Sequence, residues 1–205
     1  MGRRIRIMAD ERVQQLSARF PKDVSEHYQQ MIPAYQKGYA DYVFQTDQEA
    51  TQNRRIKQLT KNFRSYATKP YHYLQPLSSE DALQIATNWQ LSSEMQASLL
   101  NPKPNQSSFQ VIKNGLFFAY CCVEEQNGTL VLAFAIAPQY RGNGHGRACY
   151  QAIEDYIKTS FTDKQISLNL SPEEADNISF LESLGFQNVS NQDGYHLMTK
   201  PLVKE

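Results

Sequence analysis

The sequence lacks several features that would point to particular classes of protein. No apolar run approaches the roughly 20 residues that a membrane-spanning helix requires, so we expect no membrane association. No apolar segment follows the basic first residues, and we therefore expect no signal peptide. The three cysteines and four histidines form no cluster with metal-ligand spacing. An odd number of cysteines in apolar surroundings argues against a disulfide framework, so we expect a cytoplasmic protein without a metal site.

Net charge is also absent, but the charges are unevenly distributed. Residues 1–70 hold 13 Lys and Arg against 7 Asp and Glu, whereas residues 71–205 hold 8 against 14. Apolar residues at helical spacing predict an all-helical segment over 8–66, and Asp23 is expected to cap one of its helices, with Glu26 placed for a capping box. We therefore predict two domains, a basic helical N-terminal extension over 1–70 and a second domain over 71–205, with a boundary near Thr68-Lys69-Pro70.

The basic residues of the extension lie on the outer face of a helix expected over 48–66. We do not favour nucleic-acid binding, because the segment contains no recognisable helix-turn-helix or other DNA-binding motif. A charged helix face exposed to solvent is the simpler interpretation. Its tyrosine-rich face instead suggests a homodimer or a protein partner. The five basic residues are Arg54, Arg55, Lys57, Lys61 and Arg64.

Three glycines at 142, 144 and 146 lie between an apolar run over 130–136 and a helical pattern over 148–157. The run has no helical spacing and no turn residue, which predicts a buried strand. Glycine allows positive φ and a close approach of backbone to ligand, and free N–H groups at a helix N-terminus attract anions. The segment 137–147 therefore predicts a phosphate cradle of backbone amides. A plain strand-to-helix turn is the alternative, but it does not need three glycines.

The remaining patterns predict a single mixed sheet. Asn114-Gly115 and Asn127-Gly128 are typical two-residue hairpin turns, so the strands around them are antiparallel. The helix after the glycines, followed by another strand, predicts a parallel crossover. We predict an α+β fold with a mostly antiparallel central sheet, one parallel strand pair and flanking helices. A further helix is expected over 172–184, with Gly185 as its C-cap. The expected strands cover residues 71–77, 109–113, 116–125, 129–137, 165–170, 186–190 and 195–201.

The glycine segment resembles one superfamily in particular. Arg141-Gly142-Asn143-Gly144-His145-Gly146 fits the Arg/Gln-x-x-Gly-x-Gly/Ala signature of the GCN5-related N-acetyltransferase (GNAT) superfamily. The lead-in from Phe134 and the Leu184-Gly185-Phe186 ending are also similar to that superfamily. A P-loop would need a Lys-Ser/Thr ending, and a Rossmann loop would need different glycine spacing. The resemblance covers about residues 71–202 and leaves the extension unassigned.

This resemblance implies acetyl-CoA as the acyl donor. Backbone amides of the glycine loop would bind its pyrophosphate, and the strand before the loop would pair with its pantetheine arm. We expect Gly144→Glu or Gly146→Glu to abolish acetyl-CoA binding and leave the fold intact. The implied coenzyme contacts come from Phe134, Ile136, Arg141, Gly142, Asn143, Gly144, His145, Gly146, Arg147 and Asn177.

The catalytic positions common in the superfamily are not filled. Many relatives carry a Tyr that acts as general acid where this sequence has Leu181. Many also carry a Glu on the strand that corresponds to 129–137, which contains no carboxylate here. By topology the remaining acids are Tyr195, His196 and Tyr140. We predict Tyr195 as the acid, and Glu124 as the group that holds or deprotonates the amine.

Two functions follow from the resemblance. The first is an acetyl-CoA-dependent N-acetyltransferase that acetylates a primary amine, on a small molecule or a protein, by direct attack in a ternary complex. The second is a catalytically weak or inactive acetyl-CoA-binding regulatory or scaffold protein whose helical extension binds a partner. The acceptor amine stays unidentified, although the acidic balance of 71–205 suits a cationic one.

Overall fold

The computed structural model describes residues 2–66, 68, 70–162 and 165–202. The chain divides into two compact units, which are described separately. Unit 1 comprises Met1–Tyr71 and Lys113–Phe117, and unit 2 comprises His72–Ile112 and Phe118–Glu205. Lys69, within the boundary expected at 68–70, lies outside the described residues. Among the described helices, none is both long and apolar enough to span a bilayer.

Unit 1 consists of four helices around their own core. Its helices are α1 (Gly2–Arg19), α2 (Lys22–Gln30), α3 (Pro33–Phe44) and α4 (Glu49–Ser65). Leu16, Tyr28 and Val43 are fully buried among aromatic neighbours such as Phe63. The helical prediction is confirmed, because proline at residues 21 and 33 ends one helix and permits the next to begin.

Two contacts within unit 1 hold charged side chains of α2 and α4, and the first of them corrects an expectation from the sequence. Asp23 is not the N-cap of α2, because Pro21 occupies that position and the Asp23 carboxylate accepts two hydrogen bonds from Arg64. Arg55 lies over the ring of Tyr42 at 4.6 Å. Two of the five basic residues of α4 are therefore held by contacts within their own unit.

The second segment of unit 1 is the hairpin tip around Asn114-Gly115. Asn114 and Gly115 have positive φ, as the predicted two-residue turn requires. The Gly115 carbonyl accepts a hydrogen bond from the Ile32 N–H at 2.8 Å, and Asn114 Oδ1 accepts one from the Tyr71 N–H at 2.8 Å. This short segment supplies backbone partners that the helices alone do not provide.

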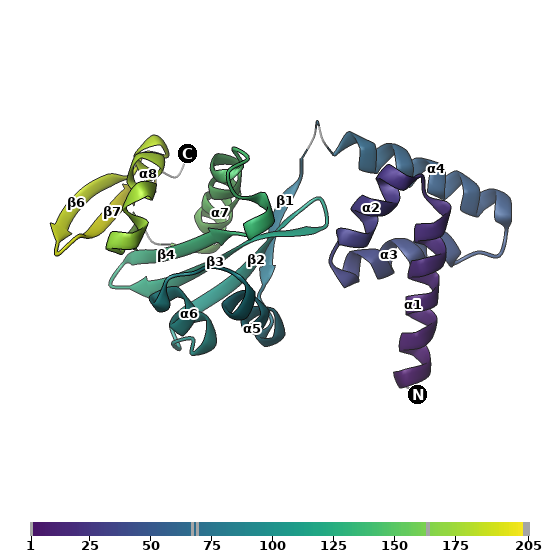
Figure 1. The fold of residues 1–205 in the computed structure, drawn as a ribbon, viewed down its shortest axis with the longest axis horizontal. Helices are drawn as coiled ribbons and strands as arrows, with labels where there is room; N and C mark the ends of the chain where they lie inside the picture. Colours follow the sequence, from purple (N-terminus) through teal and green to yellow (C-terminus); the bar gives the residue numbers. More distant parts are fainter. Residues whose placement is uncertain (1, 67, 69, 163–164, 203–205) are drawn as a thin grey trace. The chain divides into compact units, whose positions relative to one another are not determined.

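Unit 2 is built on the sheet, whose seven strands run in the order β1-β2-β3-β4-β5-β7-β6 (Figure 1). The pairing is antiparallel for β3–β4, β5–β7 and β6–β7, whereas β4 and β5 are parallel. This confirms the predicted fold class. The strands are β1 (His72–Pro76), β2 (Gln106–Lys113), β3 (Leu116–Gln126), β4 (Thr129–Ile136), β5 (Gln165–Leu170), β6 (Gln187–Gln192) and β7 (Tyr195–Pro201).

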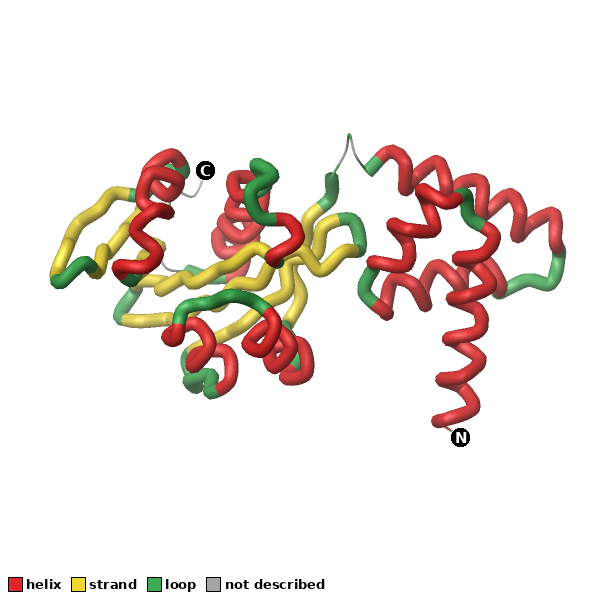
Figure 2. Tube along the Cα trace, viewed as in Figure 1, coloured by secondary structure: helices red, strands yellow, loops and turns green. Residues whose placement is uncertain are grey.

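Helices cover both faces of this sheet (Figure 2). One face carries α5 (Ser79–Asn88) and α6 (Ser93–Leu100), and the other carries α7 (Gly146–Ser160) and α8 (Ile178–Ser183). The α7 face packs a core in which Cys121, Cys149 and Ile153 are fully buried. The helix predicted over 172–184 is divided into a 3₁₀ segment, η2 (Pro172–Asn177), and α8. Gly185 follows α8 with a positive φ, as predicted.

Candidate functional site

The parallel strands β4 and β5 separate soon after they meet. They pair only at Leu130 with Ile166 and at Val131 with Ser167. Beyond this point β4 stays paired with β3 and β5 stays paired with β7. The two central strands of the sheet therefore diverge toward their carboxyl ends.

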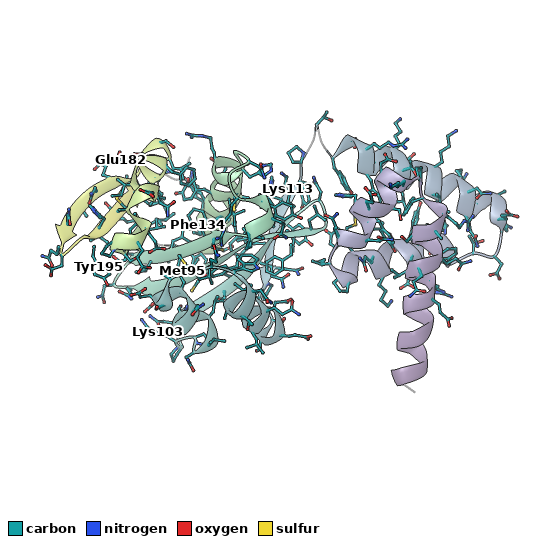
Figure 3. The ribbon with its side chains drawn as sticks, in the orientation of Figure 1. Met95, Lys103, Lys113, Phe134, Glu182 and Tyr195 are labelled. Atoms are coloured by element: carbon teal, nitrogen blue, oxygen red, sulfur yellow. The ribbon has the colours of Figure 1, made fainter. Side chains whose placement is uncertain are left out.

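The diverging part of β4 has backbone groups that face away from its partner strand. The Ala137 N–H donates to the Phe118 carbonyl at 2.9 Å. Because this direction alternates along an antiparallel strand, Leu132, Phe134 and Ile136 direct their backbone groups to the side of β5. Figure 3 shows Phe134 in the middle of the sheet. These groups form an open strand edge inside the unit.

A cavity of about 840 Å³ fills the space between the diverging strands. Its volume is in the range usual for small-molecule sites. It is bounded by β4, the glycine loop, the start of α7, the end of β5, η2, α8 and the α5–α6 connection. The lining residues used below are Gln90, Leu91, Met95, Leu132, Phe134, Ile136, Tyr140, Arg141, Gly142, Gly144, His145, Gly146, Arg147, Glu173, Glu174, Asn177, Phe180, Leu181 and Ser183.

The glycine loop places the N-terminus of α7 at this cavity. Gly142 and Gly144 have φ of 74° and 73°, a conformation that costs residues with a Cβ about 1 kcal/mol or more. A Cβ at either position would meet no atom within 4 Å. At Gly146 a Cβ would lie 2.7 Å from Cζ of Phe180, so a glutamate there would disturb the packing. Gly146→Glu would therefore force the Phe180 ring to move, so Gly144→Glu is the better test of coenzyme binding.

Both arginines of the loop hold backbone carbonyls. Arg141 donates through Nε to the Ile136 carbonyl at 2.8 Å and through Nη1 to the Gln90 carbonyl at 3.4 Å. Arg147 donates to the Ser183 carbonyl at 3.0 Å. These bonds tie the loop to β4, to the α5–α6 connection and to α8, while both side chains still line the cavity.

The glycine loop also packs on the aromatic ring of Phe118 from β3. The Phe118 ring lies 5.2 Å from the Tyr140 ring and 5.4 Å from the His145 ring, measured between centroids. Burial raises the pKa of the Tyr140 hydroxyl above its ordinary value. Tyr140 therefore stays protonated at neutral pH at the wall of the cavity.

The structure brings together most of the residues that the sequence singled out. All the residues predicted to contact the coenzyme line the cavity, except Asn143, which is exposed beside it. The two predicted catalytic residues are not among the lining residues. Tyr195 begins β7 near the end of the β6–β7 hairpin and is 50% exposed (Figure 3). Their catalytic roles stay predictions.

The Glu124 carboxylate is held by neighbouring side chains near the C-terminal end of β3. It pairs with Lys103 at 3.0 Å and accepts hydrogen bonds from Asn105 and Gln126. Burial raises its pKa, but the hydrogen bonds from Lys103 and Gln126 outweigh that effect and hold the pKa below its ordinary value. A carboxylate stabilised in this way is a weak base.

Sequence reasoning missed the two carboxylates that do line the cavity, Glu173 and Glu174 of η2. Both directly follow the strand that lies opposite β4, and residues at the carboxyl ends of neighbouring parallel strands share one edge of a sheet. That topological signal was available from the predicted crossover. Leu181, at the position expected for an acid, lines the same cavity and is buried.

Comparison with known proteins gives the family. The model of the acetyltransferase (GNAT) family matches residues 67–186, more than half of the chain. The chain belongs to the GNAT family. The GNAT match includes the open β4 edge, the glycine loop and all of α8. A search of curated proteins found no match to this GNAT protein.

Solved structures show the same fold at low sequence identity. Spermidine N-acetyltransferase from Vibrio cholerae, in complex with CoA and spermine, is 17% identical with a TM-score of 0.51, covering 64% of this chain and 95% of that one. The ribosomal-protein-S18-alanine N-acetyltransferase from Escherichia coli is 19% identical with a TM-score of 0.52, covering 66% and 96%. A domain from Methanocaldococcus jannaschii is 14% identical with a TM-score of 0.52, covering 65% and 99%. These similarities concern the fold alone.

Proposed function

We propose that the chain is an acetyl-CoA-dependent N-acetyltransferase that acetylates a primary amine by direct attack within a ternary complex. One observation carries this proposal. A single cavity joins the N-terminus of α7, with its glycine loop, to the open backbone edge of β4. Family membership supports it, since GNAT proteins use acetyl-CoA as the acyl donor.

The loop and the strand edge fit the two chemically different parts of the donor. The N–H groups of the loop and of the first turn of α7 would hold the pyrophosphate, helped by the positive end of the helix dipole. The free backbone of Phe134 would hydrogen-bond the pantetheine amides as an added strand does. The Ile136 carbonyl is occupied by Arg141, which leaves Phe134 as the principal pairing residue.

The donor supplies an activated acetyl thioester. The acceptor nitrogen attacks its carbonyl carbon, a C–N bond forms, the C–S bond breaks and the amine proton passes to solvent or a nearby base. Backbone N–H groups of β4 that face the cavity would donate to the oxygen that gains negative charge. Tyr140 is a hydroxyl at the cavity wall that could protonate the leaving thiolate. Holding both substrates together supplies a large part of the rate.

The second candidate function, an acetyl-CoA-binding protein with little turnover, is favoured by one observation. Leu181 occupies the position of the usual acid and is a buried, apolar wall of the cavity. In that case the helical unit 1 would bind a protein partner. The two functions share the donor site and differ only in whether an acceptor is acetylated.

The test combines binding with turnover. Gly144→Glu places a negative charge in an open position of the loop, and we expect it to weaken coenzyme A binding at least about a hundredfold by calorimetry. Gly128→Glu is the matched control, because Gly128 also has positive φ and open space but lies in the β3–β4 turn. Equal weakening in both variants, or in neither, would contradict the proposed donor site.

Turnover is measured as thiol release from acetyl-CoA with a panel of primary amines. Amine-dependent release is expected from the wild-type chain and not from Gly144→Glu. Tight coenzyme binding without release with any amine would support the second function instead.

A further inference from the structure

The connection between α5 and α6 forms one wall of the cavity. Leu91 lies in this connection and Met95 follows it in α6, and both side chains line the cavity. The donor as proposed above lies along the glycine loop and the β4 edge. Leu91 and Met95 belong to neither of these elements, so the wall that they form is available to an acceptor in the same cavity.

One side chain fastens this wall to the glycine loop. Nη1 of Arg141 donates to the Gln90 carbonyl at 3.4 Å. Within the described ranges, no other hydrogen bond reaches Gln90 or Leu91. The helix that follows is tied to the last turn of α5 instead, by a hydrogen bond from Gln96 to the Ala86 carbonyl at 3.2 Å. The position of the connection therefore depends on the Arg141 guanidinium.

This guanidinium can hold three groups at once. Nε of Arg141 donates to the Ile136 carbonyl at 2.8 Å, at the end of β4, while Nη1 holds Gln90. Arginine carries five N–H groups in a rigid planar fork. Among the described residues, Nη2 has no hydrogen-bond acceptor and the side chain has no carboxylate partner. Because Arg141 is exposed and lines the cavity, its charge and its remaining donors face the loop that would hold the pyrophosphate.

Arg147 is a second arginine of the same loop without this link. Its Nη2 donates to the Ser183 carbonyl at 3.0 Å and to the Ser183 hydroxyl at 3.3 Å. It is exposed and lines the cavity, as Arg141 does. In the part of the chain that the structure describes, none of its hydrogen bonds reaches the α5–α6 connection. The loop therefore contains two similar cations, of which one is bonded to the wall and the other to α8.

We infer that Arg141 is a positioning residue that couples the donor site to the wall formed by the α5–α6 connection. A pyrophosphate on the glycine loop would pair with Nη2 and fix the orientation of the guanidinium. Nη1 would then hold the Gln90 carbonyl more firmly, so the wall on which an acceptor lies becomes ordered when the donor is bound. This inference rests on the proposed donor site.

The tryptophan beside this wall reports on its motion. Trp89 directly precedes Gln90 and is the single tryptophan of the chain. Its ring lies 6.0 Å from the Tyr120 ring between centroids and is half-buried, so acrylamide reaches it in part. We expect saturating coenzyme A to lower the acrylamide quenching constant of Trp89 about twofold in the wild-type chain, because a connection that is held more firmly opens less often.

Arg141→Lys tests the coupling. Lysine keeps the charge that attracts phosphate but lacks the fork that reaches two carbonyls, so coenzyme A should leave the quenching constant of this variant unchanged. Arg147→Lys is the matched control, with the same change in the same loop, and should retain the twofold fall. Arg141→Gln is a second variant that should fold, since the GNAT signature also contains glutamine at this position, and it too should show no fall. Saturating coenzyme A in every sample removes the effect of altered affinity, and circular dichroism checks the fold.

Each outcome bears on the coupling. A fall that persists in either Arg141 variant, or that disappears equally in Arg147→Lys, overturns the inference. Calorimetric binding of coenzyme A to the wild-type chain without any fall also overturns it. If the wild-type chain does not bind coenzyme A, the proposed donor site itself has failed and the inference fails with it. Calorimetry on every sample separates the last case from the others.

Discussion

An ion pair between α7 and β7 provides a sharp test of how unit 2 is held together. Lys200 donates to Oε2 of Glu154 at 2.6 Å, and Lys158 pairs with the other oxygen at 3.0 Å. The Glu154 side chain is only 6% exposed. The Lys200 ammonium also lies 4.9 Å from the centroid of the Tyr150 ring. Lys200 therefore neutralises a buried charge and packs on an aromatic face.

The magnitude follows from what each substitution leaves behind. Removing one partner of a buried ion pair costs about 3–5 kcal/mol, because the other charge stays buried. Lys158 still partners Glu154 in Lys200→Met, so we expect a loss at the lower end, about 2–4 kcal/mol, including the contact with Tyr150. Lys158→Met is the matched control. Its ammonium is more exposed and joins the same carboxylate at an i, i+4 spacing, so its loss should cost less than about 1 kcal/mol.

Denaturant unfolding followed by tryptophan fluorescence measures this difference. Trp89 is the single tryptophan and belongs to unit 2, so its emission reports on the unit that holds the ion pair. Equal losses in the two methionine variants, or a loss below about 0.5 kcal/mol in Lys200→Met, would refute the reasoning. The double variant Glu154→Leu/Lys200→Met should recover much of the stability, because replacing both partners leaves no buried charge.

The same pair predicts a dependence on pH. Burial raises the pKa of Glu154, but the hydrogen bonds from Lys200 and Lys158 outweigh it and hold the pKa below its ordinary value of 4.5. A carboxyl with a lower pKa in the folded state stabilises the fold above the unfolded pKa, and this stabilisation is lost as the pH falls through the folded value. Wild-type stability should therefore fall more steeply below about pH 4.5 than that of the double variant.

Two further predictions concern other parts of the chain. Gly146→Ala should destabilise unit 2 by about 1–3 kcal/mol, since the added Cβ would lie 2.7 Å from Cζ of Phe180. Adding Phe180→Leu should recover part of this loss. If the single variant is as stable as the wild-type chain in the Trp89 fluorescence assay, the prediction is wrong. Burial lowers the pKa of His27, the one histidine of residues 1–71, below its ordinary value of 6.5. Unit 1 should therefore lose stability as the pH falls below 6.5, because the unfolded chain binds the proton more readily. Near-UV circular dichroism of the tyrosines, recorded on melting between about pH 5 and 8, should show a slope that His27→Gln flattens.

The features that were predicted correctly depend on residues close together in the sequence. Asn-Gly pairs adopt positive φ wherever they connect two strands, so both hairpins are confirmed without knowledge of the tertiary structure. The glycine loop was recognisable because strand, glycines and helix follow one another directly. The parallel pairing of β4 with β5 followed from the order of strand, helix and strand along the chain.

What the sequence did not reveal depends on contacts between distant residues. Lys200 and Glu154 are 46 positions apart, and nothing in their local patterns indicates that they meet. Asp23 has the spacing of a helix cap, but Arg64, 41 positions later, takes its carboxylate. The spacing of apolar and turn residues predicts helices and strands, whereas the contact partners of a side chain are known only from the three-dimensional fold.

The hairpin tip at Asn114-Gly115 has a consequence for how the chain can be divided. Unit 1 is not a continuous stretch of sequence, because residues 113–117 complete it. A fragment ending at Tyr71 would release the Ile32 N–H from Gly115 and the Tyr71 N–H from Asn114. A fragment beginning at His72 would retain the turn without the helices that pack on Leu116. Unit 1 is therefore discontinuous in sequence, and a cut between residues 71 and 72 would separate its four helices from the turn that completes it.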